Sequence, residues 1–195
     1  MYHFPQKKVA TGFSLIEVIV VFAIISILIG VTTVSFLESR QAVRDEVRKS
    51  TLKELQLVIE QYRAQYGRYP AAGCGAGSAW VGPGTVTESW GVACENYIVG
   101  LVPDFMAALP RDPREDLESS SHVVGIMYRT DADGTSYKIL FRDTVEVNQV
   151  SSYTDPFARC PRPFPAGPAA CQPSDITAGR GVQDYALYSP GAEGW

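Results

Sequence analysis

The sequence predicts an α+β fold in which one long N-terminal helix packs on a small antiparallel β-sheet. Apolar residues fill the run from Phe13 to Val34, and they recur at three- and four-residue spacing from Leu52 to Tyr66. That spacing is the periodicity of a helix. Beyond Pro70 the chain carries short β-favouring runs separated by Gly- and Pro-rich stretches, a pattern typical of strands and surface loops.

The helix is expected to run from Phe13 to Tyr66, a length of roughly 80 Å at about 1.5 Å per residue. Gly67 is placed to end it, and Pro70 prevents its resumption. The first half is apolar on all sides. The second half is amphipathic, with one apolar stripe that we expect to be core. The stripe consists of Leu52, Leu55, Ile59, Tyr62 and Tyr66, with Val43 and Val47 as a shorter upstream piece. The charged residues between them, which include Arg44, Asp45, Arg48 and Lys49, are expected to form a solvated face.

The sheet is expected from three runs of β-favouring residues. Val123–Arg129 and Ser136–Arg142 flank an Asp133-Gly134 pair, which is typical of a hairpin turn. Asp184–Tyr188 supplies a further strand, and a short helical turn is expected at 104–109. Asp131 and Asp133 suggest calcium, but without a longer series of acidic ligands a turn is the favoured interpretation. We therefore expect no cofactor and no metal site.

Four cysteines, Cys74, Cys94, Cys160 and Cys171, all follow the apolar run and lie in loop-like stretches. They allow three disulfide pairings. Nearest-neighbour pairing closes two loops and pins them, and disulfides would place this part of the chain in an oxidising, extracytoplasmic compartment. Zinc is disfavoured because no CxxC is present and His122 is the one histidine after the apolar run.

Three interpretations compete for the N-terminus. A secretory signal peptide has an apolar core of about 7–15 residues and a small-residue cleavage site, whereas the run from Phe13 to Val34 is longer and lacks such a site. A plain membrane anchor fits the length, with Lys7 and Lys8 on the cytoplasmic side. It does not explain Glu17, because a carboxylate within an apolar span is costly and marks a function by default.

The third interpretation explains Glu17. The segment Lys7-Lys8-Val9-Ala10-Thr11-Gly12-Phe13-Ser14-Leu15-Ile16-Glu17-Val18 resembles the type IV prepilin signal. The resemblance implies cleavage between Gly12 and Phe13 by a prepilin peptidase, followed by N-methylation of Phe13. It also implies that Glu17 pairs with the new α-amino group of a neighbouring subunit during assembly.

The resemblance to the type IV pilin and type II secretion pseudopilin superfamily implies a pilin fold with four parts. These are a cleaved leader at 1–12, a transmembrane and assembly helix at 13–35, the amphipathic half of that helix at 36–67, and a globular head at 68–195. Beyond the signal, Leu109-Pro110-Arg111-Asp112-Pro113 resembles the Leu-Pro-x-Asp-Pro segment of the same proteins, and Tyr185–Gly194 resembles the closing strand and turn of the major pseudopilins. Arg114–Leu117 departs from their pattern, so pilus and pseudopilus both stay open.

An enzyme is disfavoured because no GxSxG, HExxH or P-loop is present. The net charge of −4 gives no general attraction to nucleic acid. The resemblance implies a subunit that sits in the inner membrane with its N-terminus in the cytoplasm, and that is then polymerised with copies of itself and other pilins. An inner-membrane platform and its ATPase would drive the assembly. The alternative is a minor or tip pilin that binds a surface or takes up DNA, with Trp80 and Trp90 as candidate binding residues.

Overall fold

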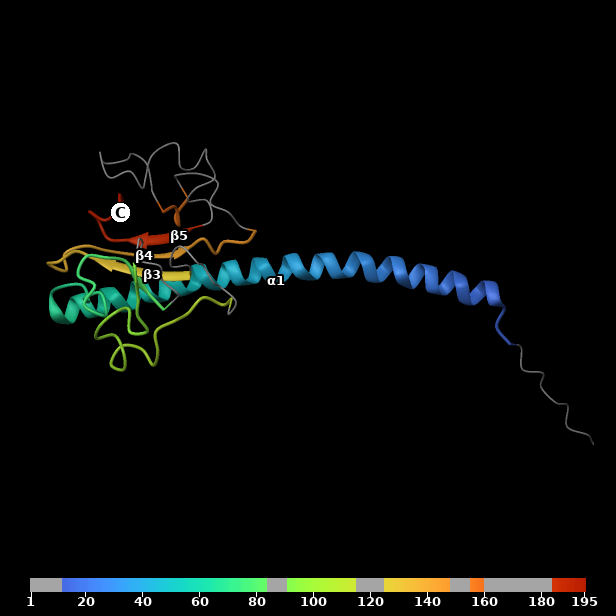
Figure 1. Cartoon of the computed structure of the whole chain (residues 1–195), viewed down its shortest axis with the longest axis horizontal. Coiled ribbons are helices and arrows are strands. Elements are labelled where there is room, and N and C mark those ends of the chain that lie inside the picture. Colours follow the sequence, from blue (N-terminus) through green and yellow to red (C-terminus); the bar gives the residue numbers. More distant parts are fainter. Residues whose placement is uncertain (1–11, 84–90, 115–124, 148–154, 160–183) are drawn as a thin grey trace, which may run out of the picture. The chain divides into compact units, whose positions relative to one another are not determined.

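The computed structural model describes residues 12–83, 91–114, 125–147, 155–159 and 184–195, without the side chains of 30–35. The chain divides into two compact units, Met1–Arg40 and Gln41–Trp195. In chain order the elements are α1 (Leu15–Tyr66), β1 (Val81–Gly82), β2 (Val92–Ala93), β3 (Gly125–Thr130), β4 (Tyr137–Arg142) and β5 (Tyr185–Tyr188) (Figure 1).

The strands form a five-stranded sheet in the order β2-β1-β3-β4-β5. The hairpin of β3 and β4 is antiparallel with Met127 opposite Leu140, and β4 pairs antiparallel with β5. β1 pairs antiparallel with β3 but parallel with β2. The predicted α+β fold, a long N-terminal helix on a small sheet, is therefore confirmed, and the sheet is mixed rather than wholly antiparallel.

The helix ends at Tyr66, as its sequence predicts, and begins at Leu15 rather than Phe13. Gly67 adopts a φ of 75°, and its N–H donates to the carbonyl oxygen of Arg63 at 2.8 Å. This left-handed residue is the usual end of a helix because glycine has no Cβ to clash. The chain then turns toward the hairpin, where the N–H of Tyr69 donates to the carbonyl oxygen of Gly134 at 2.8 Å.

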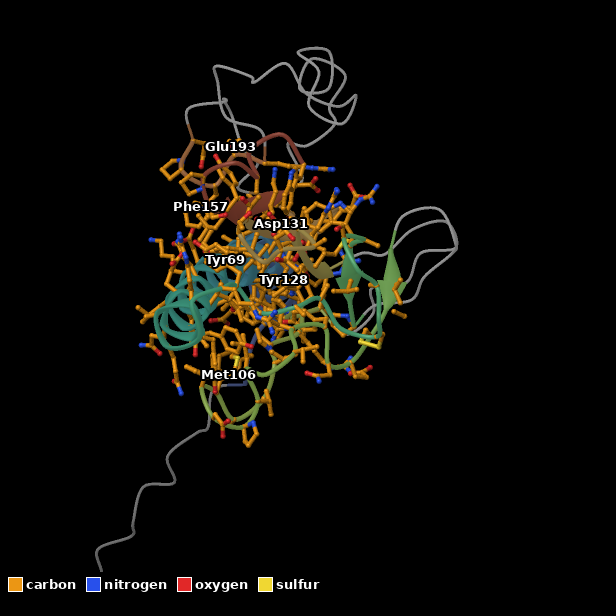
Figure 2. The ribbon with its side chains drawn as sticks, turned by 90° about the vertical axis from the view of Figure 1, so that its left-hand side faces the viewer. Tyr69, Met106, Tyr128, Asp131, Phe157 and Glu193 are labelled. Atoms are coloured by element: carbon orange, nitrogen blue, oxygen red, sulfur yellow. A yellow bond between two sulfur atoms is a disulfide. The ribbon has the colours of Figure 1, made fainter. Side chains whose placement is uncertain are left out.

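The main core lies between the second half of α1 and one face of the sheet. Leu52, Leu55 and Ile59 are fully buried there, which confirms this part of the predicted stripe. Tyr69 and Tyr128 lie in this core (Figure 2), and the Tyr128 hydroxyl donates to the carbonyl oxygen of Pro70 at 2.6 Å. Tyr66 is half exposed, so the stripe ends one turn earlier than predicted.

The prediction for the helix upstream of Leu52 is wrong. Val43 and Val47 are 62% and 42% exposed, whereas Asp45 and Arg48 are fully buried. Around Asp45 and Arg48, the side of α1 that was predicted to face solvent therefore faces the head. The reason is a set of ion pairs around Arg48, which offsets much of the usual cost of burying these charges.

The opposite face of the sheet, here called the outer face, carries a second apolar cluster. Side chains alternate between the two faces along a strand, so Met127 and Leu140 point away from α1. They pack with Trp80 and Ala186, and Tyr188 and Trp195 cover the edge of the cluster. Trp80 is therefore part of the fold's packing rather than a displayed binding residue, and Trp90 lies outside the described residues.

Two loops differ from prediction. The helical turn expected at 104–109 lies a few residues earlier, where the N–H groups of Phe105 and Met106 both donate to the carbonyl oxygen of Leu101, at 2.9 and 3.1 Å. β1 and β2 were not predicted. The predicted start of β3 at Val123 lies outside the described residues.

Candidate functional site

The segment with the expected cleavage site is open and accessible. Residues 12–14 precede the helix and are exposed, and the side chain of Phe13 is 82% exposed. A Cβ placed on Gly12 would meet no atom of the described residues within 4 Å. The fold of this chain therefore does not itself require glycine at this position.

Glu17 lies in the first turn of α1, two residues after its start at Leu15. The N–H of Val18 in the same turn donates to the carbonyl oxygen of Ser14 at 3.3 Å. A carboxylate there is favoured by the partial positive charge at a helix N-terminus. Among the described residues, no cation forms an ion pair with Glu17.

The surface around Glu17 is apolar on every side of the helix. From Leu15 to Ile29 the large apolar side chains are exposed, including Ile16, Ile19 and Phe22. A contiguous apolar surface of this kind marks a contact with another protein or with lipid. Within the part of the chain that the structure describes, no helix combines the length and apolar content needed to cross a membrane.

In the head, a buried ion-pair cluster holds α1 to two loops. Both terminal nitrogens and Nε of Arg48 are used: Nε and Nη2 donate to the two carboxylate oxygens of Asp112 at 2.8 Å each. Nη1 donates to Asp45 at 2.8 Å and to Glu146 at 3.1 Å. The bidentate pairing of guanidinium and carboxylate is the strong form of this interaction.

The same cluster fixes the chain that follows β4. The N–H groups of Glu146 and Val147 donate to the carboxylate of Asp45, at 3.1 and 2.9 Å. Arg44 forms a second ion pair with Glu146. Hydrogen bonds from Arg44 lower the pKa of the Glu146 carboxyl, and those from Arg48 add to this effect. Asp112 belongs to the Leu-Pro-x-Asp-Pro segment, so this segment helps to hold α1 against the rest of the head.

Cys74 and Cys94 form a disulfide across a sequence separation of 20. It ties the loop after α1 to the end of β2, and Cys94 is buried while Cys74 is exposed. The other two predicted disulfide residues, Cys160 and Cys171, lie outside the described residues.

Asp131 has a structural role in the hairpin turn. One of its carboxylate oxygens accepts from the N–H of Thr135 at 2.7 Å, and the other accepts from the Thr135 hydroxyl. These bonds and neighbouring backbone N–H groups lower the pKa of Asp131 against the opposing effect of burial. Over the described residues, no three acidic, His or Cys side chains come together as a metal site.

The N-terminal segment also matches a known family. Residues 7–33 match the family described as the prokaryotic N-terminal methylation motif. The chain carries this motif. It is the class III signal of type IV pilins and pseudopilins, and it covers Gly12, Phe13 and Glu17. No curated protein and no solved structure matched the chain. The motif thus supports a processed, pilin-like protein, and it implies processing by prepilin peptidase and assembly with other pilins.

Sequence reasoning missed the buried charges of the head. A possible signal was the three-residue spacing of Asp45 and Arg48, which places opposite charges on the same helix face as Leu52 and Leu55. Lys138 in β4 was also missed, because a lysine between apolar residues on a half-buried strand is usually an outward, solvated position.

Proposed function

We propose that this chain is a structural, non-enzymatic subunit of a type IV pilus or of a type II secretion-like pseudopilus. The single observation that carries the proposal is the methylation motif, placed on an exposed segment and the first turn of an exposed apolar helix. The leader would be removed by prepilin peptidase, and Phe13 would then be N-methylated. The subunit would polymerise with copies of itself and other pilins through the N-terminal helix.

Cleavage between Gly12 and Phe13 needs an extended, uncovered backbone. Residues 12–14 are not helical, and within the described part of the chain nothing lies within 4 Å of a Cβ placed on Gly12. Because the fold accepts a side chain at this position, any requirement for glycine would come from the peptidase. Gly12→Val is therefore expected to leave the precursor uncleaved with an unchanged head, while Ser14→Ala, as a matched control, is cleaved normally. Normal cleavage of Gly12→Val would contradict the proposed site.

Glu17 would supply the charge that pairs with the N-terminal amine of a neighbouring subunit. In the mature protein both charges would lie in an apolar environment, where each is costly unless it is paired. Glu17→Gln should be inserted and cleaved but should assemble poorly. Glu38→Gln removes an exposed carboxylate further along α1 and should assemble normally. Equal assembly of the two variants would argue against the role of Glu17.

Before assembly, the precursor would sit in the inner membrane with Lys7 and Lys8 in the cytoplasm and the head outside. There an assembly platform and its ATPase would extract it. The disulfide of the head is compatible with an oxidising compartment. The direct test is mass spectrometry of purified fibres, which should contain a chain that begins at N-methyl-Phe13. Fibres without this chain, or with residue 1 intact, would refute the proposal.

A further inference from the structure

Among the described residues, four cationic side chains gather at the outer face of the sheet. Lys138 in β4 stands opposite Arg129 in β3. Arg142 points to the same face as Lys138, because it follows four residues later in the same strand. Arg159 lies beside them, since its carbonyl oxygen accepts from Nζ of Lys138 at 2.6 Å. Charges on so apolar a surface are costly unless each has a partner.

Three of these four cations have partners within the chain. Nζ of Lys138 lies between 2.6 and 3.0 Å from three main-chain oxygens, and the side chain is fully buried. Arg159 forms an ion pair with Asp184 at 2.5 Å, and Arg142 forms one with Asp143 at 3.3 Å. Their charges are therefore balanced or solvated by groups of the protein itself.

Arg129 is the exception. Within the part of the chain that the structure describes, its guanidinium forms no hydrogen bond and no ion pair, and its Nε is buried without a partner. The side chain as a whole is half-buried, and its two terminal nitrogens reach solvent. Burial lowers the pKa of Arg129, whereas the pKa of Arg48 is raised because its carboxylates outweigh burial. Arg129 thus lacks the counter-ion that the buried arginine of the head has.

Two tryptophan rings frame this guanidinium. The central carbon of the Arg129 guanidinium lies 4.9 Å from the ring centre of Trp195 and 5.8 Å from that of Trp80. Trp80 is buried in the apolar cluster of the outer face, and Trp195 is half-buried at its edge. A cation over an indole ring is stabilised, more so where water is excluded. The rings therefore hold the guanidinium in place and leave its outer end open.

The segment that carries Trp195 is held to the sheet at two points. The Ser136 hydroxyl donates to the carbonyl oxygen of Pro190 at 3.2 Å, and Nζ of Lys138 donates to the main-chain oxygen of Trp195 at 3.0 Å. The segment lies beside β5 (Figure 1). The ring of Trp195 is thus in position before any ligand arrives, which reduces the entropy cost of binding.

We propose that Arg129, framed by Trp80 and Trp195, is a binding site for the carboxylate of a separate partner molecule. The planar fork of a guanidinium matches the two oxygens of a carboxylate, and such bidentate pairs are the strong form of this interaction. The site shares no residue with the N-terminal motif, so it stands or falls independently of the proposed assembly.

The charge of the site favours a carboxylate over a phosphate. Arg129 contributes one unbalanced positive charge beside an apolar cluster. A carboxylate carries one negative charge and leaves the pair neutral, whereas a phosphate group carries about −1.5 to −2 at neutral pH. The excess charge would stay uncompensated in a partly dry site. Lys138 cannot balance it, because its amine is buried and already bonded to the main chain.

The test is NMR of the full-length wild-type protein in detergent micelles, following the Nε–H signal of Arg129 and the indole N–H signal of Trp195. Sodium acetate should shift both signals, and the change should be half complete at or below about 100 mM. Sodium chloride at the same ionic strength should leave them in place, because salt screening does not select one arginine. Sodium phosphate at neutral pH should bind more weakly than acetate.

Variants separate the guanidinium fork from its charge. Arg129→Gln should weaken acetate binding by about tenfold or more, read from the Trp195 signal. Arg129→Lys keeps the charge but should also bind more weakly than the wild type, because an ammonium does not pair with two oxygens side by side. Arg111→Gln is the matched control: Arg111 is exposed and paired with Glu95, and the variant should bind acetate as the wild type does.

Three outcomes would count against the proposal. Equal shifts with acetate and chloride would overturn the site, and this result needs no variant that folds. Tighter binding of phosphate than of acetate would overturn the choice of a carboxylate. Signals that change on dilution of the protein without added acid would overturn the separate partner and make a second copy of this chain the source.

Discussion

At the scale of single residues, the buried cluster around Arg48 decides how the helix meets the head. Its guanidinium is fully buried and contacts Asp45, Asp112 and Glu146. Burial alone would lower the pKa of Arg48, but its hydrogen bonds and ion pair with Asp112, together with Glu146 and Asp45, raise it overall. The guanidinium is thus charged at every accessible pH. The three carboxylates around it rely on that charge to balance their own.

Arg48→Met should destabilise the head by about 3–5 kcal/mol, because it leaves buried carboxylates without their counter-ion. The free energy of unfolding by urea measures this effect. Arg111→Met is the matched control: its pair with Glu95 is exposed on both sides, and such pairs contribute at most about 1 kcal/mol. Similar losses in the two variants would show that Arg48 is not the centre of the cluster.

Glu146 makes the same cluster sensitive to acid. Its pKa is lowered below the usual 4.5, first by the hydrogen bonds from Arg44. A carboxyl whose pKa is lower in the folded state stabilises the fold above its unfolded pKa, and this contribution is lost as the pH falls through the folded value. The unfolding free energy should therefore decrease below about pH 4.5, and less steeply in Glu146→Gln. Parallel pH profiles of the two proteins would contradict this assignment.

These residues also mark where sequence reasoning fails at this scale. Gly12, Phe13 and Glu17 lie within the matched methylation motif, which is a local signal that a sequence can show directly. Asp45 and Arg48 were misplaced because a charged residue is assigned to solvent unless its partners are known. Those partners, Asp112 and Glu146, are distant in sequence and are brought close only by the fold.

At the scale of elements, α1 was predicted closely and the sheet less so. Gly67 ends the helix because a residue with positive φ is needed directly after the apolar pattern stops, and glycine adopts that conformation readily. Gly134 also has a positive φ, in the turn that joins β3 and β4. β1 and β2 have two residues each, which is too short for any periodicity to show. They pair in parallel, with Val81 opposite Val92, through backbone hydrogen bonds between segments about ten residues apart in sequence, and this pairing is not visible in a local pattern.

The side of α1 that carries Val43 and Val47 suggests a further role for this helix in assembly. Val43 and Val47 are exposed and line a shallow groove with Ala42, Glu46 and Ser50. In a polymer, a neighbouring subunit can cover such a surface. Val43→Lys should therefore reduce fibre formation while it changes head stability by less than about 0.5 kcal/mol, as exposed substitutions do.

Fibre yield from cells and urea unfolding of the purified variant measure these two effects. Gln65→Lys adds the same charge at another exposed position of α1 and should assemble like the wild type. A Val43→Lys variant that assembles normally would remove this side of α1 from the interface.

At the scale of the whole molecule, the disulfide cross-links the segment after α1 to the segment after β2. Cys74 and Cys94 close a loop with a sequence separation of 20, which in the chain-entropy model stabilises the fold by about 3 kcal/mol. Cys74→Ala combined with Cys94→Ala should lower the unfolding free energy by about this amount. The same loss should appear when the wild-type protein is unfolded under reducing conditions, and an unchanged free energy would show that the loop is held by other contacts.

The two compact units contain different structural features, and this difference leads to a final prediction. The unit from Gln41 to Trp195 contains the core, the Arg48 cluster, the disulfide and the sheet, whereas Met1–Arg40 contains the exposed apolar side chains from Phe13 to Ile29. Residues 41–195 produced alone in an oxidising compartment should therefore fold and stay monomeric, and the full chain should need detergent. Circular dichroism, thiol counting and size-exclusion chromatography test this. An unfolded fragment would mean that the head depends on the first part of the helix, and an oligomeric one would place an assembly contact in the head itself.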